Sequence, residues 1–430
     1  MAPTLATACA ALPPKGAPVD LGRPGGDGMP PLIIIGAGLA GWTTVREFRK
    51  LDSTTPVLVV TLDSGDFYAK PSLSNAFAHK RTPEQLVSTP AAKMADTLQV
   101  TLLAHTQVEA IDLATHTVHT TQGGTAQTLA YSRLVLATGA QPIRVPVQGN
   151  ASGRVQSVNS LDDFFSFFYS LSPRGTCADS YQIESRNIVI MGAGLIGCEF
   201  ANDLAQAGHR VQVVDPSTRP LAALLPESAG LQLQEALGAL GVVWHFGAMV
   251  QAVDTRDPAD PALPALTVQL SNGQTLPADA VLSAIGLRAD THLASAAGLA
   301  CERGIVVDTY LQTSAPQVYA LGDGAQYASA GQRTLPFVMP IMQAAKALAA
   351  TLAGTPTPLV FALMPVAIKT PALPIVVAAA HPAQAGSWVA DDAATRGLWR
   401  FLDPQGSQRG FVLTGSHTAR RMEQARATQA

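Results

Sequence analysis

The feature that most constrains the fold is a glycine motif of the form G-x-G-x-x-G that occurs twice. Its glycines are Gly36, Gly38 and Gly41 in the first copy and Gly192, Gly194 and Gly197 in the second. Each copy follows an apolar, β-branched run and opens a stretch with helical character, which is the context the motif needs to bind a dinucleotide. There the first glycine makes a tight turn, the second lets the backbone approach a pyrophosphate, and the third lets helix pack on strand. Two copies in context predict a chain that binds two dinucleotides and passes electrons between them.

The composition is that of a large globular protein without a strongly charged surface. The 430 residues are enough for two or three domains, and 47% of them are hydrophobic. Charged residues make up only 14%, with a formal net charge of −3, so we expect neither a nucleic acid nor a membrane as a partner. No apolar run in the sequence is long enough to span a bilayer.

Cysteine usage and the order of secondary-structure signals give two further expectations. The cysteines at positions 9, 177, 198 and 301 form no C-x-x-C pair, so we expect reduced thiols in a cytoplasmic protein and no metal site. Residues 1–30 are rich in alanine, proline and glycine and are expected to be a flexible N-terminal extension. Beyond them, strands alternate with helices, which predicts an α/β fold.

An acidic residue after the second strand of each glycine-motif unit would hydrogen-bond an adenosine ribose. In the second unit this residue is Asp215, directly after the run 211–214. Its carboxylate would accept from both ribose hydroxyls and repel a 2′-phosphate, which favours NADH over NADPH. Arg219 is the counter-signal, because a guanidinium there would hold that phosphate, and the alternative for Asp215 is a turn role alone. In the first unit the acid is Asp63, for which a ribose contact and a turn role stay open.

Two further segments indicate a flavin nucleotide. Thr138 and Gly139 follow an apolar strand and would bring small residues close to a bulky group. Gly322 and Asp323 end another strand just before a helix, where the Asp323 carboxylate would accept from the ribityl hydroxyls of FAD.

With these motifs in this order, residues 31–355 resemble the FAD-dependent pyridine-nucleotide oxidoreductases. The resemblance implies two Rossmann-like domains, in which an NAD-binding domain (151–276) is inserted into an FAD-binding domain made of two pieces (31–150 and 277–355). Residues 356–430 would form a small C-terminal α+β domain. The implied cofactors are non-covalently bound FAD and NADH.

One segment narrows the branch of the family. Residues 67–76 contain no cysteine, which excludes the relatives that work through a thiolate beside the flavin. This segment, together with residues 194–203 and 364–371, resembles the rubredoxin–NAD reductase branch. The implied acceptor is rubredoxin or a similar small acidic electron carrier, which would take the two electrons of reduced FAD singly. The alternatives are a reductase of ferredoxin or flavorubredoxin, an NADH oxidase that uses oxygen, and a non-catalytic flavin redox sensor.

The resemblance also implies catalytic residues. Lys70 would lie near the flavin and stabilise negative charge on its reduced form. Glu199 would pair with Lys70 and lie near the nicotinamide, whereas Lys369 has a similar claim that competes with a role in shaping a strand edge. The competing interpretation of Lys70 is a solvated loop lysine, and Trp42 is expected to serve in helix–strand packing.

The C-terminal region carries arginines that would steer an acidic partner. Arg396, Arg400 and Arg409 are left open as parts of such a basic face. Residues 420–430 are instead expected to be a frayed, solvated tail.

Overall fold

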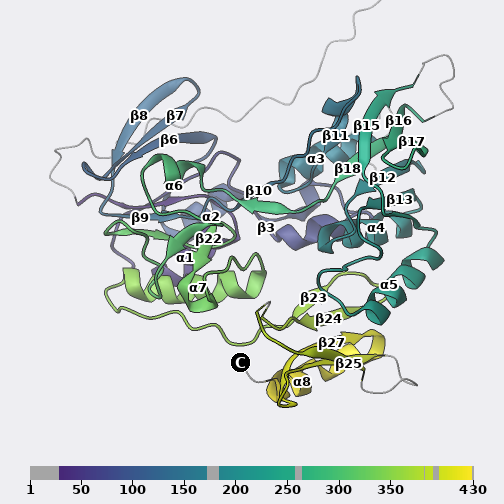
Figure 1. Ribbon diagram of the computed structural model, residues 1–430. Coiled ribbons are helices and arrows are strands. Elements are labelled where there is room, and N and C mark those ends of the chain that lie inside the picture. The colour runs from purple at the N-terminus through teal and green to yellow at the C-terminus, as the bar shows by residue number, and fades with distance from the viewer. Residues whose placement is uncertain (1–28, 172–183, 257–263, 382, 391–396, 429–430) are drawn as a thin grey trace, which may run out of the picture.

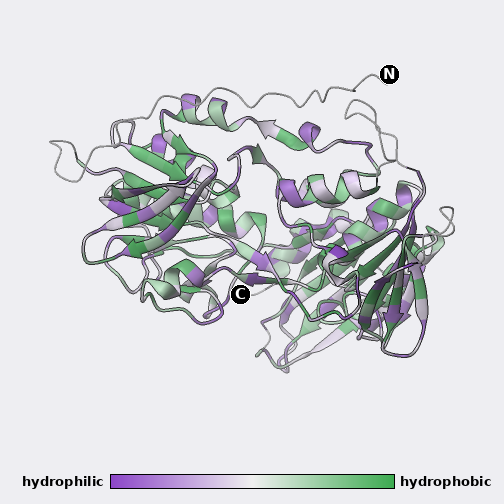
Figure 2. Ribbon diagram, turned by 90° about the horizontal axis from the view of Figure 1, so that it is seen from above, coloured by the Kyte–Doolittle hydropathy of each residue, from purple (hydrophilic) through white to green (hydrophobic). Residues whose placement is uncertain are grey.

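The chain forms two α/β lobes and a smaller β-rich unit. The computed structural model describes residues 29–171, 184–256, 264–381, 383–390 and 397–428, and the expected N-terminal extension lies almost entirely outside them. The β-rich unit lies below the two lobes in Figure 1. Seen from above, hydrophobic strands run through each lobe (Figure 2). The predicted α/β class is confirmed.

The first lobe is built on a parallel five-stranded sheet in the order β21-β9-β1-β2-β5. These strands are β1 (Leu32–Ile35), β2 (Val57–Val60), β5 (Thr101–Leu103), β9 (Arg133–Leu136) and β21 (Val318–Ala320). Strands β1 and β2 are buried at every position, as expected for a parallel sheet covered on both faces. Helices α1 (Leu39–Arg49) and α7 (Val338–Leu352) pack against each other beside this sheet.

Smaller elements complete the first lobe. An antiparallel sheet of β6, β7 and β8 lies on the opposite side of the lobe from α7 (Figure 1). The bounds of the remaining elements are β3 (Phe67–Tyr68), 3₁₀ helix η1 (Lys70–Asn75), η2 (Glu84–Leu86), β4 (Val87–Thr89), α2 (Ala91–Leu98), β6 (Thr106–Asp112), β7 (Thr117–Gln122), β8 (Thr125–Ala130), α6 (His292–Ala296), β20 (Ile305–Val307), β22 (Ala325–Tyr327) and η4 (Ala328–Ala330).

The second lobe repeats the plan of the first. Its parallel five-stranded sheet has the order β11-β18-β12-β13-β14, and a three-stranded antiparallel sheet of β15, β16 and β17 lies beside it. The strands are β11 (Val155–Gln156), β12 (Asn187–Met191), β13 (Arg210–Asp215), β14 (Val243–Phe246), β15 (Val250–Thr255), β16 (Leu266–Leu270), β17 (Thr275–Ala278) and β18 (Ala280–Ser283). The helices and the 3₁₀ turn are η3 (Ser152–Arg154), α3 (Leu161–Leu171), α4 (Leu195–Gln206) and α5 (Glu227–Ala239).

The strand pairing corrects the expected second domain boundary at residue 277. Strand β18 pairs in parallel with β12 and β11, so residues 280–283 belong to the second lobe. The chain crosses between the lobes on an antiparallel ribbon of β10 (Ala140–Pro142) and β19 (Leu287–Ala289). The return to the first lobe therefore lies at about residue 286, because a short apolar strand is equally compatible with either sheet until its partners are known.

The C-terminal unit is an antiparallel five-stranded sheet with a short helix. Its order is β23-β24-β27-β26-β25, with bounds β23 (Val366–Ile368), β24 (Ile375–Ala378), β25 (Ser387–Ala390), β26 (Leu398–Leu402), β27 (Gln408–Thr414), η5 (Gly415–Arg420) and α8 (Arg421–Ala427). The expectation of a frayed tail over residues 420–430 is wrong for the described part. Gln424 of α8 is 2% exposed, and Gln408 Nε2 donates to its carbonyl at 3.3 Å, so the helix is held against β27.

One hydrophobic cluster joins all three units. It contains Phe77 from the first lobe, Phe164 and Phe200 from the second, and Ile375 and Trp399 from the C-terminal sheet. The rings of Phe77 and Phe164 pack against each other with their centroids 5.3 Å apart. The segment that follows Lys70 is therefore packed into the second lobe rather than into its own.

Candidate active site

The first glycine loop has a backbone that side chains would obstruct. Gly36 has a φ of 109°, and a Cβ on Gly41 would lie 1.9 Å from the Gly36 carbonyl oxygen. Gly38 is the N-cap of α1, where no side chain caps the helix and no acid stands in the first turn. The free N–H groups and the positive end of the helix dipole therefore face outward and are available to a phosphate.

The second loop repeats this geometry. Gly192 has a φ of 103°, and a Cβ on Gly197 would lie 1.9 Å from the Gly192 carbonyl oxygen. Gly194 is the N-cap residue of α4, and no side chain caps this helix. Both loops thus have the backbone geometry that a pyrophosphate site needs.

Both loops open onto one cavity of about 2030 Å³. Its walls include Gly36 and Gly38 from the first lobe, Gly192 and Gly194 from the second, and Lys369 from the C-terminal region. Sites for a single small ligand typically measure about 300–1,000 Å³, so this cavity has room for two dinucleotides.

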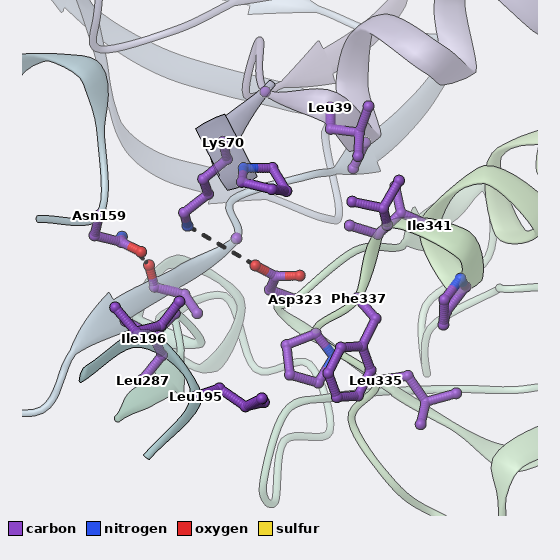
Figure 3. Close-up of a pocket in the computed structure, with 18 of the residues that line it drawn as sticks. Leu39, Lys70, Asn159, Leu195, Ile196, Leu287, Asp323, Leu335, Phe337 and Ile341 are labelled. Carbon is purple, nitrogen blue, oxygen red and sulfur yellow. Dashed lines mark hydrogen bonds and ion pairs between the residues drawn. The ribbon is translucent and has the colours of Figure 1, made fainter. Parts of the chain in front are cut away.

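Lys70 points into the cavity toward Asp323 (Figure 3). The Lys70 ammonium nitrogen lies 3.9 Å from an Asp323 carboxylate oxygen. Burial lowers the pKa of Lys70, and the charge of Asp323 partly offsets this effect. Burial likewise raises the pKa of Asp323, against the opposing charge of Lys70. Each group therefore supports the charged form of the other.

The expected Lys70–Glu199 pair is wrong. Glu199 is 5% exposed and makes an ion pair with the Lys369 ammonium. The Lys369 backbone N–H donates to Glu199 Oε1 at 2.9 Å, and Ser74 Oγ donates to Oε2 at 2.7 Å. The two lysines thus divide two carboxylates between them: Lys70 pairs with Asp323, and Lys369 pairs with Glu199.

Ser74 is a site residue that sequence reasoning missed. Its hydroxyl also accepts from the Lys369 ammonium at 2.6 Å, and it lines the cavity. We call Ser74, Glu199 and Lys369 the Glu199 cluster. Its members come from η1, from α4 and from the segment after β23. The sequence signal that could have identified Ser74 as a site residue is its position four residues after Lys70.

Thr138 and Gly139 follow strand β9, and Gly322 and Asp323 follow strand β21, as the sequence predicts. The helix expected directly after Asp323 is wrong, because residues 325–327 form β22, which pairs with β20, and α7 begins only at Val338. Thr138 and Gly139 line the cavity, and Thr138 Oγ1 donates to the Asp290 carbonyl at 3.0 Å. Gly322 approaches α1 so closely that a Cβ would lie 2.9 Å from Ala40 Cβ. Tyr327, which sequence reasoning also missed, fixes this turn: its hydroxyl accepts from the Gly322 N–H at 2.8 Å and donates to the Gly322 carbonyl at 3.1 Å.

Asp63 lines the cavity but also serves its own turn. Its Oδ1 accepts from the Gly65 N–H at 3.0 Å and from Thr61 Oγ1 at 2.7 Å. Trp42 Nε1 donates to the Gly65 carbonyl at 2.9 Å, and the Trp42 side chain is fully buried. The packing role expected of Trp42 is confirmed.

Asp215 is bonded to the second glycine loop itself. Its Oδ2 accepts from the Ala193 N–H at 2.6 Å, and its Oδ1 accepts from the Ser217 N–H at 2.7 Å. Arg219 turns away, since its Nη2 donates to the Ala222 and Leu225 carbonyls at 3.3 and 3.1 Å. The guanidinium is therefore not presented to the cavity, and the counter-signal for a 2′-phosphate has no structural support.

The arginines expected to form a basic face in the C-terminal region differ in their surroundings. Arg409 lines the cavity, and its Nε donates to Asp403 at 2.9 Å. Arg400 Nε contacts the Gln424 side-chain oxygen at 3.5 Å. Arg396 lies outside the described residues.

Two glycine loops, each at the N-terminus of a helix, share one cavity with two lysine–carboxylate pairs. This arrangement defines the class of protein as a two-cofactor oxidoreductase. Comparison with known proteins gives its family. The pyridine nucleotide-disulphide oxidoreductase family model matches residues 30–350, and a rubredoxin binding C-terminal domain model matches residues 358–428. The chain belongs to the pyridine nucleotide-disulphide oxidoreductase family.

Named relatives extend this result over almost the whole chain. A rubredoxin-NAD(+) reductase of Alcanivorax borkumensis is 41% identical over 395 residues, which are 92% of this chain and 97% of the relative. A nitric oxide reductase FlRd-NAD(+) reductase of Aeromonas salmonicida is 40% identical over 357 residues, or 83% and 86% of the two chains. The solved covalent complex of putidaredoxin reductase with putidaredoxin has the same fold, with a TM-score of 0.80, 24% identity and 93% of each chain covered.

Among the described residues, no helix is long and apolar enough to cross a membrane.

Proposed function

We propose that the chain transfers electrons from NADH, through non-covalently bound FAD, to rubredoxin or a similar one-electron protein. The observation that carries the proposal is that both glycine loops open onto one cavity, which would bring two dinucleotides bound there close to each other. The similarity to rubredoxin-NAD(+) reductases and the rubredoxin-binding model over the C-terminal unit support the acceptor.

The first lobe is the proposed FAD domain. The α1 loop would hold the pyrophosphate, and Asp63 lies at the cavity wall where a ribose would reach it. Residues Thr138, Gly139, Gly322 and Asp323 would hold the ribityl and flavin portions. FAD supplies a carrier that takes a hydride and releases electrons one at a time.

The second lobe is the proposed NADH domain. The α4 loop would hold the pyrophosphate, and Asp215 would accept from the adenosine ribose. A negative charge at that position opposes a 2′-phosphate, and the Arg219 guanidinium is already held by two carbonyls. Both features support NADH over NADPH.

Lys70, Glu199 and Lys369 are the proposed catalytic residues. Lys70 borders the cavity with its side chain 38% exposed, and its positive charge would stabilise negative charge on the reduced flavin. Glu199 and Lys369 both line the cavity and would orient the nicotinamide. No thiolate is required, since residues 67–76 contain no cysteine.

A flavorubredoxin is the second candidate acceptor. The observation that favours it is the 40% identity to the nitric oxide reductase FlRd-NAD(+) reductase of Aeromonas salmonicida. We also place the protein in the cytoplasm, in keeping with the two free cysteines among the described residues, Cys198 and Cys301.

The test is NADH oxidation by the purified flavoprotein without oxygen, with rubredoxin, flavorubredoxin, ferredoxin or no acceptor added. We expect turnover to require rubredoxin and to fall with added salt if Arg409 helps to steer an acidic partner. Flavin reduction without transfer to any acceptor would support the redox sensor, and fast turnover with oxygen alone would support an oxidase. If Lys70→Met leaves both flavin reduction and transfer to rubredoxin unchanged, the role of Lys70 is wrong.

A further inference from the structure

Helix α4 presents three buried polar side chains to the other two units of the molecule. Glu199, Asn202 and Asp203 are 5%, 1% and 2% exposed. Residues separated by three and four positions share one face of a helix. The carboxylates and the amide of this face therefore point in one direction, toward the junction of the three units.

Each of two active-site segments is attached to this face at two points. In the C-terminal segment, Lys369 binds Glu199 through its N–H, and the Ala372 N–H donates to Asn202 Oδ1 at 3.0 Å. A turn over residues 370–373, which includes the second of these points, is closed by the Leu373 N–H donating to the Thr370 carbonyl at 2.9 Å. The backbone on which Lys369 lies is thereby held at two points.

The η1 segment is attached in the same way. Ser74 Oγ donates to Glu199. The Phe77 and Ala78 N–H groups donate to the two oxygens of Asp203 at 3.0 and 2.9 Å. The Asp203 contacts therefore hold the backbone that follows Ser74, whose hydroxyl also accepts from the Lys369 ammonium.

Neither Asn202 nor Asp203 borders the cavity, whereas Ser74, Glu199 and Lys369 all do. A cofactor bound in the cavity would therefore meet the Glu199 cluster and not Asn202 or Asp203, which lie further along α4. Any effect of Asn202 or Asp203 on the reaction must pass through the segments that they hold.

We propose that Asn202 and Asp203 are positioning residues for hydride transfer: Asn202 places Lys369, and Asp203 places Ser74, against Glu199. This inference rests on the proposed NADH-to-flavin reaction. A displacement of about 1 Å in a reacting geometry can cost about a hundredfold in rate. The four backbone bonds that Glu199, Asn202 and Asp203 accept are the fixed points that prevent such a displacement.

The experiment is anaerobic rapid mixing of flavin-loaded Asn202→Ala and Asp203→Asn with NADH, with rates expressed per bound flavin. Asp203→Asn keeps the shape of the side chain and removes one of two acceptor oxygens. We expect the limiting rate of flavin reduction to fall by about tenfold or more, with little change in the NADH concentration for half-saturation. Gln206→Ala, at a more accessible position of the same helix, is the matched control and should leave both values unchanged.

Crossed backgrounds separate positioning from general loosening of the fold. In Lys369→Met, adding Asn202→Ala should cause little further loss, whereas adding Asp203→Asn should still slow the reaction. In Ser74→Ala, adding Asp203→Asn should cause little further loss, whereas adding Asn202→Ala should still slow the reaction. Asp203→Glu, which retains both acceptor oxygens, should recover part of the rate lost in Asp203→Asn.

Two outcomes would overturn the inference. One is a limiting rate equal to wild type in flavin-loaded Asn202→Ala and Asp203→Asn. The other is additive losses in every background, with lowered thermal stability, which would mean a structural role alone. If the wild-type flavin is not reduced by NADH, the proposed function itself fails, and that result is distinct from both.

Discussion

The two glycine loops have the same backbone, but the acids that follow them are bonded differently. Gly36 and Gly192 have φ values of 109° and 103°, and a Cβ added to the third glycine of either loop would lie 1.9 Å from the carbonyl oxygen of the first. In the second unit Asp215 accepts from the loop residue Ala193. In the first unit the bonds of Asp63 come from residues of its own turn, Thr61 and Gly65.

The comparison separates two properties of a dinucleotide site. The loop and the helix N-terminus recognise phosphate, which every dinucleotide carries. The acid at the end of the following strand distinguishes one dinucleotide from another. In the second lobe this acid, Asp215, accepts from the glycine loop, whereas in the first lobe Asp63 accepts from its own turn. We therefore expect substitutions in the loops to act alike and substitutions of the two acids to act unequally.

The largest effect is expected from Gly41→Ala and Gly197→Ala, because each new methyl group would meet a backbone carbonyl that cannot yield without moving the loop. Gly41→Ala should purify with little or no FAD. Gly197→Ala should stay yellow but bind NADH poorly. Absorbance of the bound flavin and an NADH titration measure the two effects, with Gly238→Ala, where a Cβ meets nothing within 4 Å, as the control. The assignment of the lobes is reversed if Gly197→Ala is the variant that loses flavin.

The next effect concerns the free energy of unfolding at low pH, which should depend on a buried histidine in the second lobe that has no counterpart at the matching position of the first. Strand β13 follows the buried His209, whereas β2 follows Pro56, which does not titrate. His209 Nδ1 accepts from the Arg186 N–H at 3.2 Å, and burial lowers the pKa of His209 to about 4.

Because the unfolded chain binds this proton near the ordinary pKa of about 6.5, His209 reduces stability progressively as the pH falls from about 6.5 to about 4. The loss should reach roughly 3 kcal/mol. In His209→Asn the side-chain oxygen still accepts from Arg186 but does not titrate, so its free energy of unfolding should fall less steeply with acid. Denaturant unfolding at about pH 7 and about pH 4 checks this, and parallel losses in both proteins would contradict it.

A smaller effect is expected at the two acids. Asp215→Ala removes both the proposed ribose acceptor and the partner of the Ala193 N–H. Hydrogen bonds to a charged group contribute about 1.5–3 kcal/mol, so the NADH concentration for half-saturation should rise by about tenfold or more. Asp63→Ala should weaken FAD binding by less. Equal losses would show that coupling between acid and loop is irrelevant.

The smallest effect is expected for Arg219→Ala. Since its guanidinium is held by the Ala222 and Leu225 carbonyls, its removal should leave the preference for NADH over NADPH unchanged in kcat/KM. A marked shift in that preference would show that Arg219 reaches the coenzyme.

The sequence predicts local structure well where a pattern is tied to one backbone geometry. Apolar runs predict the strands 32–35 and 187–191, and the glycine motifs predict the tight loops after them and the helices that follow. The sequence analysis also predicts a separate C-terminal α+β domain over residues 356–430, where the structure has the antiparallel sheet β23-β24-β27-β26-β25.

The errors concern choices that depend on distances between segments far apart in the chain. Lys70 has Asp323 rather than Glu199 as its partner because the packing of Phe77 and the bonds of Asp203 place Ser74, and not Lys70, against Glu199. The run 280–283 has no internal sign of which sheet it joins. Helix α8 is stabilised by Gln424 against Gln408, a contact between polar residues that hydrophobic patterning does not show.

The central claim is that electrons pass from NADH at the second loop to FAD at the first and then to a rubredoxin-type carrier. The most direct test is a single anaerobic experiment: the flavin-loaded protein is mixed with one equivalent of NADH, and then with two equivalents of oxidised rubredoxin, while the absorbance of the flavin is followed. The account predicts rapid bleaching with NADH, slower bleaching in flavin-loaded Gly197→Ala, and full recovery of the flavin colour with two equivalents of rubredoxin. Bleaching at the wild-type rate in Gly197→Ala, or no recovery with rubredoxin, would contradict it.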